Sequence, residues 1–132
     1  MAPQGLTTIK SSQPPHETMG RLEAAIKAKG LTVFARIDHA RGASAAGLPL
    51  RPTEVLIFGN AMGGTPLMQA AQTIGIDLPL KALVWQDASG ETWLSLNDPA
   101  WLAARHGLSG VEAVVGKLAA LLEDVAKTAT AA

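Results

Sequence analysis

Residues 51–70 read RPTEVLIFGNAMGGTPLMQA, and this stretch decides the fold. The apolar run VLIF, inside Thr53–Gly59, predicts a strand. The glycines that follow predict a turn, and Thr65 with Pro66 suits the N-cap and the first position of a helix. The stretch therefore predicts a strand, a glycine-rich turn and a helix that runs to about Ile74.

Four more segments have the pattern of strands. The segments Leu80–Gln86 and Glu91–Leu96 are separated by Asp-Ala-Ser-Gly, which is typical of a four-residue hairpin loop, so we expect them to pair antiparallel. Earlier in the chain, alternating apolar and polar residues predict a strand at Leu31–Asp38. A shorter strand is expected at Gly5–Lys10.

Helices are expected on both sides of these strands. Apolar residues at helical spacing predict a first helix over His16–Lys29, which Gly30 ends. Asp98 and Pro99 predict a short helix to His106, and a long amphipathic helix follows, with Ser109 as its N-cap. We therefore predict an α+β fold: a two-layer antiparallel sheet with helices on one face, in the order β-α-β4-α, with small inserted helices.

One domain accounts for the whole chain, because 132 residues can bury a core without a metal or a disulfide. We divide it into an N-terminal segment with the first strand (residues 1–15), a single domain (16–127) and a frayed tail (128–132). In the middle strands both faces are apolar, whereas helices on one face would leave the other set exposed. We therefore expect a homodimer that covers the second face.

Composition excludes several function classes. The chain has 11 basic and 11 acidic residues without a basic cluster, so we expect neither a nucleic acid nor a membrane as a partner. It has no cysteine, and no apolar run reaches 18 residues. Neither a phosphate loop nor a dinucleotide fingerprint is present, so no cofactor is expected. We expect a cytoplasmic protein.

Short motifs along the chain resemble a known family. Asp38-His39-Ala40, Phe58-Gly59-Asn60, Gly64-Thr65-Pro66-Leu67, Asp77-Leu78-Pro79 and Asn97-Asp98-Pro99 occur in the order seen in the domain of unknown function 302 (DUF302) family. The resemblance covers about residues 22–108. It implies a β-α-β4-α arrangement of the TATA-binding-protein-like type, often dimeric, with no established activity.

The glycine-rich turn is one candidate ligand site. Backbone N–H groups at a helix N-terminus can hold an anion, and glycines let a ligand approach the chain. A tight structural turn explains the same residues, and Asn60 suits a turn equally well. The candidate ligand-binding residues for a small molecule or an anion are Gly59, Asn60, Gly63, Gly64 and Thr65.

Asp38, His39 and Glu54 are candidate catalytic residues. Carboxylates and an imidazole beside the glycine turn would supply groups for proton transfer. Alternatively, Asp38 caps a small helix and Glu54 pairs with Arg36 or Arg51. No metal site is expected, because the three histidines are dispersed without a metal-binding spacing. The sequence thus favours a dimeric ligand-binding or interaction module; a small enzyme using these three residues and a structural or assembly protein are the alternatives.

Overall fold

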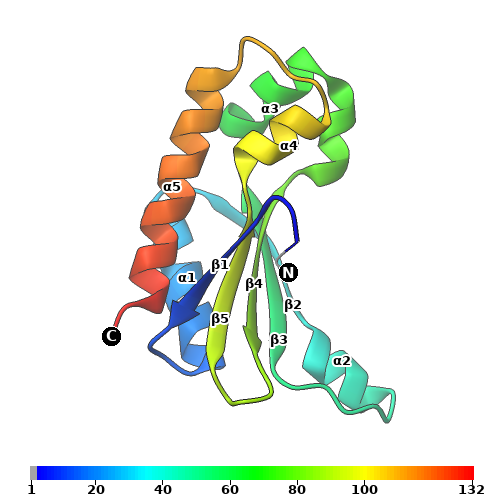
Figure 1. Ribbon diagram of the computed structural model, residues 1–132, viewed down its shortest axis with the longest axis vertical. Helices are drawn as coiled ribbons and strands as arrows, with labels where there is room; N and C mark the ends of the chain where they lie inside the picture. The colour runs from blue at the N-terminus through cyan, green and yellow to red at the C-terminus, as the bar shows by residue number, and fades with distance from the viewer. Residues whose placement is uncertain (1–2) are drawn as a thin grey trace.

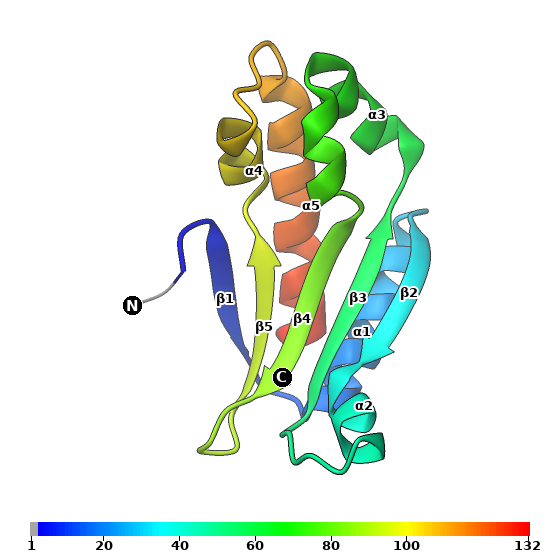
Figure 2. The same cartoon turned by 90° about the vertical axis from the view of Figure 1, so that its right-hand side faces the viewer.

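A single antiparallel sheet of five strands forms the centre of the computed structural model, which describes residues 3–132. Figure 2 looks onto this sheet, with the long helices behind it. The strands lie in the spatial order β1-β5-β4-β3-β2, and every neighbouring pair is antiparallel. Their bounds are β1 Leu6–Ser11, β2 Thr32–Asp38, β3 Thr53–Gly59, β4 Leu80–Gln86 and β5 Thr92–Asn97.

Two helices, α1 (Pro15–Ala28) and α5 (Glu112–Thr130), pack side by side on one face of the sheet (Figure 1). At one end of the molecule α3, η1 and α4 form a cap, and α2 projects from the other end (Figure 1). These smaller helices are α2 His39–Ala45, α3 Ala61–Ala70, the 3₁₀-helix η1 Gln72–Asp77 and α4 Pro99–Arg105. The predicted α+β fold with helices on one face is confirmed.

Strand alternation divides the apolar residues between two environments. Leu56 and Phe58 of β3 and Val84 of β4 point toward α1 and α5 and are fully or almost fully buried. Their neighbours on the opposite face are only partly buried. We call this second surface the open face; its central side chains are Val55, Ile57, Leu83, Trp85 and Trp93.

A second, smaller core holds the cap together. Leu67 of α3, Ile74 of η1 and Leu102 of α4 are buried against one another and against Val111, next to the start of α5. Leu118 on α5 contacts this cluster and the main core. The cap therefore fixes the position of the glycine-rich segment at the end of β3.

The helix after β3 begins earlier than predicted. Asn60, not Thr65, is the N-cap of α3, because its Oδ1 accepts a hydrogen bond from the Gly63 N–H at 2.8 Å. Pro66 consequently lies inside α3. Its missing N–H leaves the carbonyl of Met62 without its helical partner, and Met62 is at the surface, where water can replace that bond.

A β-bulge at Phe34 changes which side chains of β2 share a face. Val33 pairs with Phe58, but Ala35 pairs with Ile57, so the register shifts by one residue between them. Regular alternation along the predicted strand Leu31–Asp38 would place Val33 and Ala35 on the same face, but the bulge places them on opposite faces, so this part of the prediction is wrong. The bulge leaves Phe34 57% exposed, and it brings Arg36, two residues later, to the helix-covered face.

The predictions at both ends of α5 are also wrong. Ser109 does not cap the helix, because Gly110 adopts a left-handed conformation (φ +74°) and α5 begins at Glu112 without a side-chain cap. The tail predicted to fray from residue 128 continues the helix to Thr130. Ala129 is fully buried, and the Thr130 carbonyl accepts a hydrogen bond from the Ser12 N–H at 2.9 Å.

Candidate functional site

The structure separates the two predicted groups of site residues. Glu54 is the second residue of β3 and Gly59 is its last, so they are five residue steps apart along extended chain. At about 3.3 Å per residue the two ends are about 17 Å apart. Asp38 and Glu54 line a pocket at one end of β3, whereas the glycine-rich segment lines another pocket at the opposite end. The predicted joint site is therefore wrong.

Glu54 is held by an ion pair on the helix-covered side of the sheet. The Arg36 Nε donates to Glu54 Oε1 at 3.0 Å, and Arg36 Nη2 donates to Oε2 at 3.1 Å. Glu23 of α1 also accepts from Arg36, at 3.3 Å. These hydrogen bonds, the ones to Glu54 above all, raise the pKa of Arg36. Glu54 thus has the partner expected of a structural residue.

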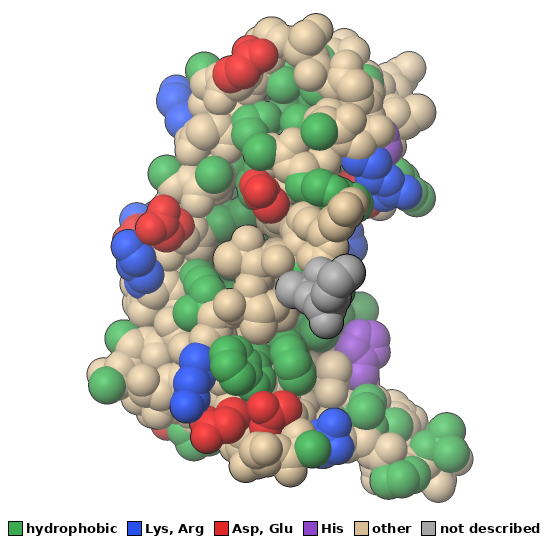
Figure 3. All heavy atoms as spheres, in the orientation of Figure 1, with side chains coloured by type: hydrophobic (Ala, Val, Ile, Leu, Met, Phe, Trp, Pro, Cys, Tyr) green, Lys and Arg blue, Asp and Glu red, His purple; other side chains and the backbone are tan. Residues whose placement is uncertain are grey.

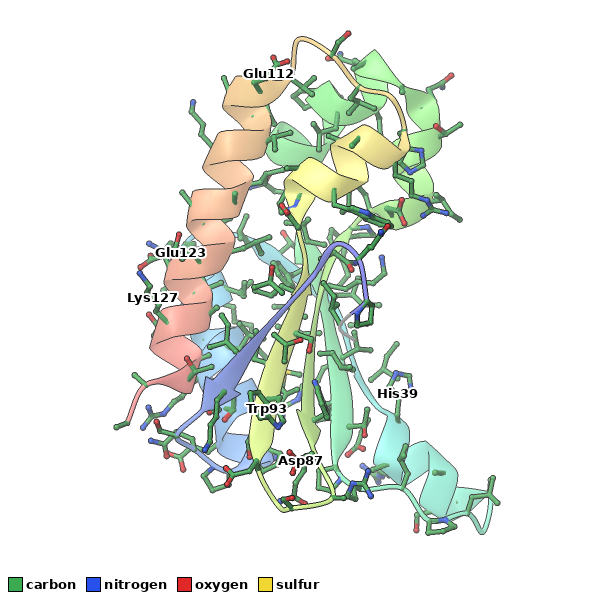
Figure 4. The ribbon with its side chains drawn as sticks, in the orientation of Figure 1. His39, Asp87, Trp93, Glu112, Glu123 and Lys127 are labelled. Atoms are coloured by element: carbon green, nitrogen blue, oxygen red, sulfur yellow. The ribbon has the colours of Figure 1, made fainter. Side chains whose placement is uncertain are left out.

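Asp38 and His39 do not join Glu54 in a catalytic group. The Asp38 carboxylate is the N-cap of α2 and accepts from the Arg41 N–H at 2.9 Å. His39 is exposed where β2 meets α2, and Figure 4 shows its ring pointing outward from the chain. His39 does not line the pocket that contains Asp38 and Glu54. The proposed acid-base trio is not assembled by this fold.

The five candidate ligand-binding residues lie together in one pocket of about 290 Å³, which we call the glycine pocket. It is bounded by the start of α3, the first residues of β2, the segment before β4 and the middle of α5. Among residues 3–132, no charged side chain contributes to it. Its lining consists of Leu31, Phe34, Gly59, Asn60, Ala61, Gly63, Gly64, Thr65, Met68, Gly75, Leu78, Pro79, Leu80 and Leu118.

The glycines in the pocket wall permit close packing. A Cβ at Gly63 would lie 3.3 Å from Asn60 Oδ1 and 3.4 Å from a methyl group of Leu118, so the helix N-terminus approaches α5 closely there. At Gly64 the nearest atoms are 3.7 Å or more away. Gly63 therefore has a structural reason to be glycine, whereas Gly64 leaves space that belongs to the pocket.

Sequence reasoning missed the apolar half of this pocket. Phe34 reaches it through the bulge of β2, and Leu118 reaches it from a helix more than fifty residues further along the chain. Neither contact follows from spacing in the sequence. Of the apolar residues that line the pocket, the sequence motifs had singled out only Leu78 and Pro79, in Asp77-Leu78-Pro79.

Comparison with known proteins establishes the family. Residues 7–125 match the family model described as domain of unknown function DUF302. The chain belongs to the DUF302 family. A DUF302 protein from Bacillus stearothermophilus, described as uncharacterized, has the same fold. Its crystal structure matches with a TM-score of 0.85 and 20% sequence identity, over 96% of this chain and 99% of that one.

Two curated relatives are named as channels. The chain is 55% identical over 104 residues, 79% of its length, to fluoride-specific ion channel FluC 1 of Brucella suis and to fluoride-specific ion channel FluC 2 of Brucella melitensis. The matched region makes up 41% and 38% of those two proteins. The DUF302 chain thus spans about two fifths of their length. Within residues 3–132, no helix has both the length and the apolar character needed to cross a bilayer.

Proposed function

We propose that this DUF302 chain is a dimeric module that binds a small, uncharged and mostly apolar molecule in the glycine pocket. The observation that carries the proposal is the pocket's composition, since a volume of about 290 Å³ is lined mostly by apolar side chains and glycines and by no charged side chain of residues 3–132. Ligand sites are typically concave and apolar, with few polar groups that fix orientation. Here the Asn60 side chain and the Thr65 hydroxyl are those polar groups.

The absence of charge in the lining determines the class of ligand. A cation or an anion moved into this pocket would lose hydration without a side chain of opposite charge to replace it, which is unfavourable. An apolar molecule would instead gain from contact with Phe34, Met68, Leu78 and Leu118. The volume is at the lower end of the range for ligand pockets, which favours a small molecule.

A matched pair of substitutions tests the proposal. Binding of neutral apolar fragments, for example indole and toluene, would be followed by backbone NMR shifts. Gly64→Ala places a methyl group in the pocket at ordinary contact distance from Leu78 and Met68, and it should weaken binding about tenfold. Gly116→Ala makes the same change in α5 with nothing within 4 Å, and it should leave binding unchanged. Equal affinity for both variants, or shifts confined to residues outside the pocket, would refute the proposal.

The open face supports the dimer in this proposal. Trp85 and Trp93 stack there with ring centroids 6.3 Å apart, and each indole N–H already has an acceptor within the chain. Figure 4 shows Trp93 and its acceptor Asp87 at the hairpin end of β5. The rings therefore present mainly carbon, which favours an apolar partner surface.

The size of the open face also suits a second copy of the chain. Five strands about 4.8 Å apart and about 20 Å long present about 500 Å², so two copies would bury about 1,000 Å². Exposed Leu48 and Leu50, in the segment that follows α2, lie beyond the end of the sheet and would enlarge the contact. Figure 3 shows hydrophobic side chains gathered on this projecting segment, at the lower right.

A second candidate function is that this chain acts in the cytoplasm as a binding partner of a fluoride channel. The observation that favours it is the 55% identity to a region that makes up about two fifths of proteins named as fluoride-specific ion channels. Adding the purified chain to proteoliposomes that contain such a channel should change fluoride efflux, measured with a fluoride electrode. Efflux that is the same with the chain, without it and with heat-denatured chain would contradict this candidate.

A further inference from the structure

A hydroxyl, an imidazole and a carboxylate form a hydrogen-bonded chain in the cap. Thr73 Oγ1 lies 2.9 Å from His106 Nδ1, and His106 Nε2 lies 2.6 Å from Asp77 Oδ2. Thr73 is the second residue of η1 and Asp77 is its last, and His106 is the C-cap of α4. None of these residues lines the glycine pocket. The cluster is therefore separate from the site described above.

Arg105 holds the Asp77 carboxylate in one orientation, and the carboxylate in turn orients the His106 imidazole. Arg105 Nη1 donates to both oxygens of Asp77 at 2.8 Å. Partial burial opposes ionisation of Asp77, but the hydrogen bonds and charges of His106 and Arg105 outweigh it and lower its pKa. In the neutral imidazole, His106 Nε2–H donates a hydrogen bond to the ionised Asp77, and Nδ1 is then the acceptor for the Thr73 hydroxyl. This is the order of groups that activates a hydroxyl nucleophile.

The three hydrogen-bonded side chains differ in their exposure to solvent. The His106 side chain is 9% exposed and that of Asp77 17%, whereas Thr73 is at the surface. In a 3₁₀-helix, side chains three residues apart lie one above the other, so Ile76 is next to Thr73. Ile76 is 76% exposed, so it provides apolar surface beside Thr73 for the acyl group of a substrate.

We propose that Thr73 and His106, positioned by Asp77, form a catalytic site for hydrolysis of small esters with apolar acyl groups. Thr73 Oγ1 forms a bond to the acyl carbon while its proton passes to His106 Nδ1. The ester C–O bond breaks, and the leaving alcohol takes that proton from His106. Water, deprotonated by His106, then attacks the acyl group on Thr73, which releases the carboxylic acid and restores the hydroxyl.

The test uses the full chain with p-nitrophenyl acetate at neutral pH. Release of nitrophenolate measures turnover, and mass spectrometry of acid-quenched samples locates an acetyl group. We expect acetylation of the peptide that contains Thr73, and we expect Thr73→Val to abolish this label and to lower the rate by about 10²-fold, because the attacking hydroxyl and its proton transfer to His106 are both lost. Thr73→Ser keeps the hydroxyl and should retain both the label and the activity.

Two controls separate catalysis by the cluster from background. Thr128→Val removes an exposed hydroxyl from the far end of α5 and should leave the rate unchanged. His39→Gln measures what an exposed imidazole outside the cluster contributes to ester hydrolysis. A rate loss in His39→Gln equal to that in His106→Gln would identify background and overturn the proposal.

Asp77 needs a separate measurement because it acts through His106. Asp77→Asn should lower kcat with little change in KM, because the amide no longer holds the His106 ring with its Nε2 proton toward residue 77 while the surface that binds the substrate is unchanged. Equal turnover in wild type and Thr73→Val, or acetyl groups found only on lysines, would overturn the proposal. The cluster would then be a structural connection between η1 and α4.

Discussion

Arg36 and Glu54 form a forked ion pair across β2 and β3, with donor–acceptor distances of 3.0 and 3.1 Å, on the face that α1 covers. The Arg36 side chain is 26% exposed and that of Glu54 16%, so solvent screens the pair only in part. Glu23 of α1 accepts a further hydrogen bond from Arg36. The three residues connect the first helix to the edge of the sheet.

Replacement of Arg36 should therefore destabilise the fold. Arg36→Met leaves the Glu54 carboxylate half-buried without its donor, and we expect the free energy of unfolding to fall by about 1–3 kcal/mol, as for charged hydrogen bonds elsewhere. Urea denaturation followed by circular dichroism measures it. The matched control is Lys127→Met, which breaks an exposed pair with Glu123 on α5 (Figure 4) and should change stability by less than about 0.5 kcal/mol. Equal effects of the two substitutions would contradict the structural role.

The two neighbouring glycines at the start of α3 should respond differently to alanine. Gly64→Ala should stabilise the chain by about 0.5–1 kcal/mol, because alanine favours helix and its Cβ has ordinary contacts there. At Gly63 the new Cβ would press on the Asn60 cap and on Leu118, so the gain should be smaller or become a loss. Thermal unfolding of both variants, with Gly116→Ala as the control, measures these changes in stability. A larger gain at Gly63 than at Gly64 would show that the cap geometry is wrong.

The open face should control oligomeric state without controlling folding. We expect the chain to sediment as a dimer at micromolar concentration, at twice 13.6 kDa. Leu83→Asp places a charge on the open face and should give a folded monomer, because the side chain is only partly buried within one chain. Phe58→Asp, inside the core, should instead unfold it.

Analytical ultracentrifugation and circular dichroism distinguish these outcomes. Ala119→Asp adds the same charge on the exposed side of α5 and should leave the dimer intact. A wild-type chain that sediments as a monomer across the micromolar range would remove the dimer from the proposed function.

Local sequence patterns predicted the strands well because strand alternation is itself local. The predicted bounds Thr53–Gly59 and Leu80–Gln86 match β3 and β4. The bulge at Phe34 was not predictable, since it depends on pairing between β2 and β3 rather than on β2 alone. The tail was mispredicted for a similar reason: residues 128–130 are helical because their inner side packs on α1 and the sheet.

The candidate site shows the same limit. The predicted strand Thr53–Gly59 was long enough to show that Glu54 and the glycine turn lie at opposite ends, so that part of the error was avoidable. The apolar walls of the glycine pocket and the contacts of His106 depend on how α5 and α4 dock. No spacing of residues in the sequence indicates either the pocket walls or the partners of His106.

Acid sensitivity provides a further prediction about Asp77. Its pKa is lower in the folded chain than its ordinary value of 3.8: burial raises it, but His106 and Arg105 lower it by more. The ionised carboxylate therefore stabilises the fold fully above that value, and the contribution is lost as the pH falls through the folded pKa. We expect Asp77→Asn to be less stable than wild type at about pH 5 and the difference to shrink toward about pH 2. Urea unfolding at several pH values measures this difference in stability.

Glu23, Asp87 and Asp124 also have lowered pKa values, so both proteins should lose stability in acid, and only the difference between them reports on Asp77. A difference that stays constant over this range would show that Asp77 has no such ionised partnership.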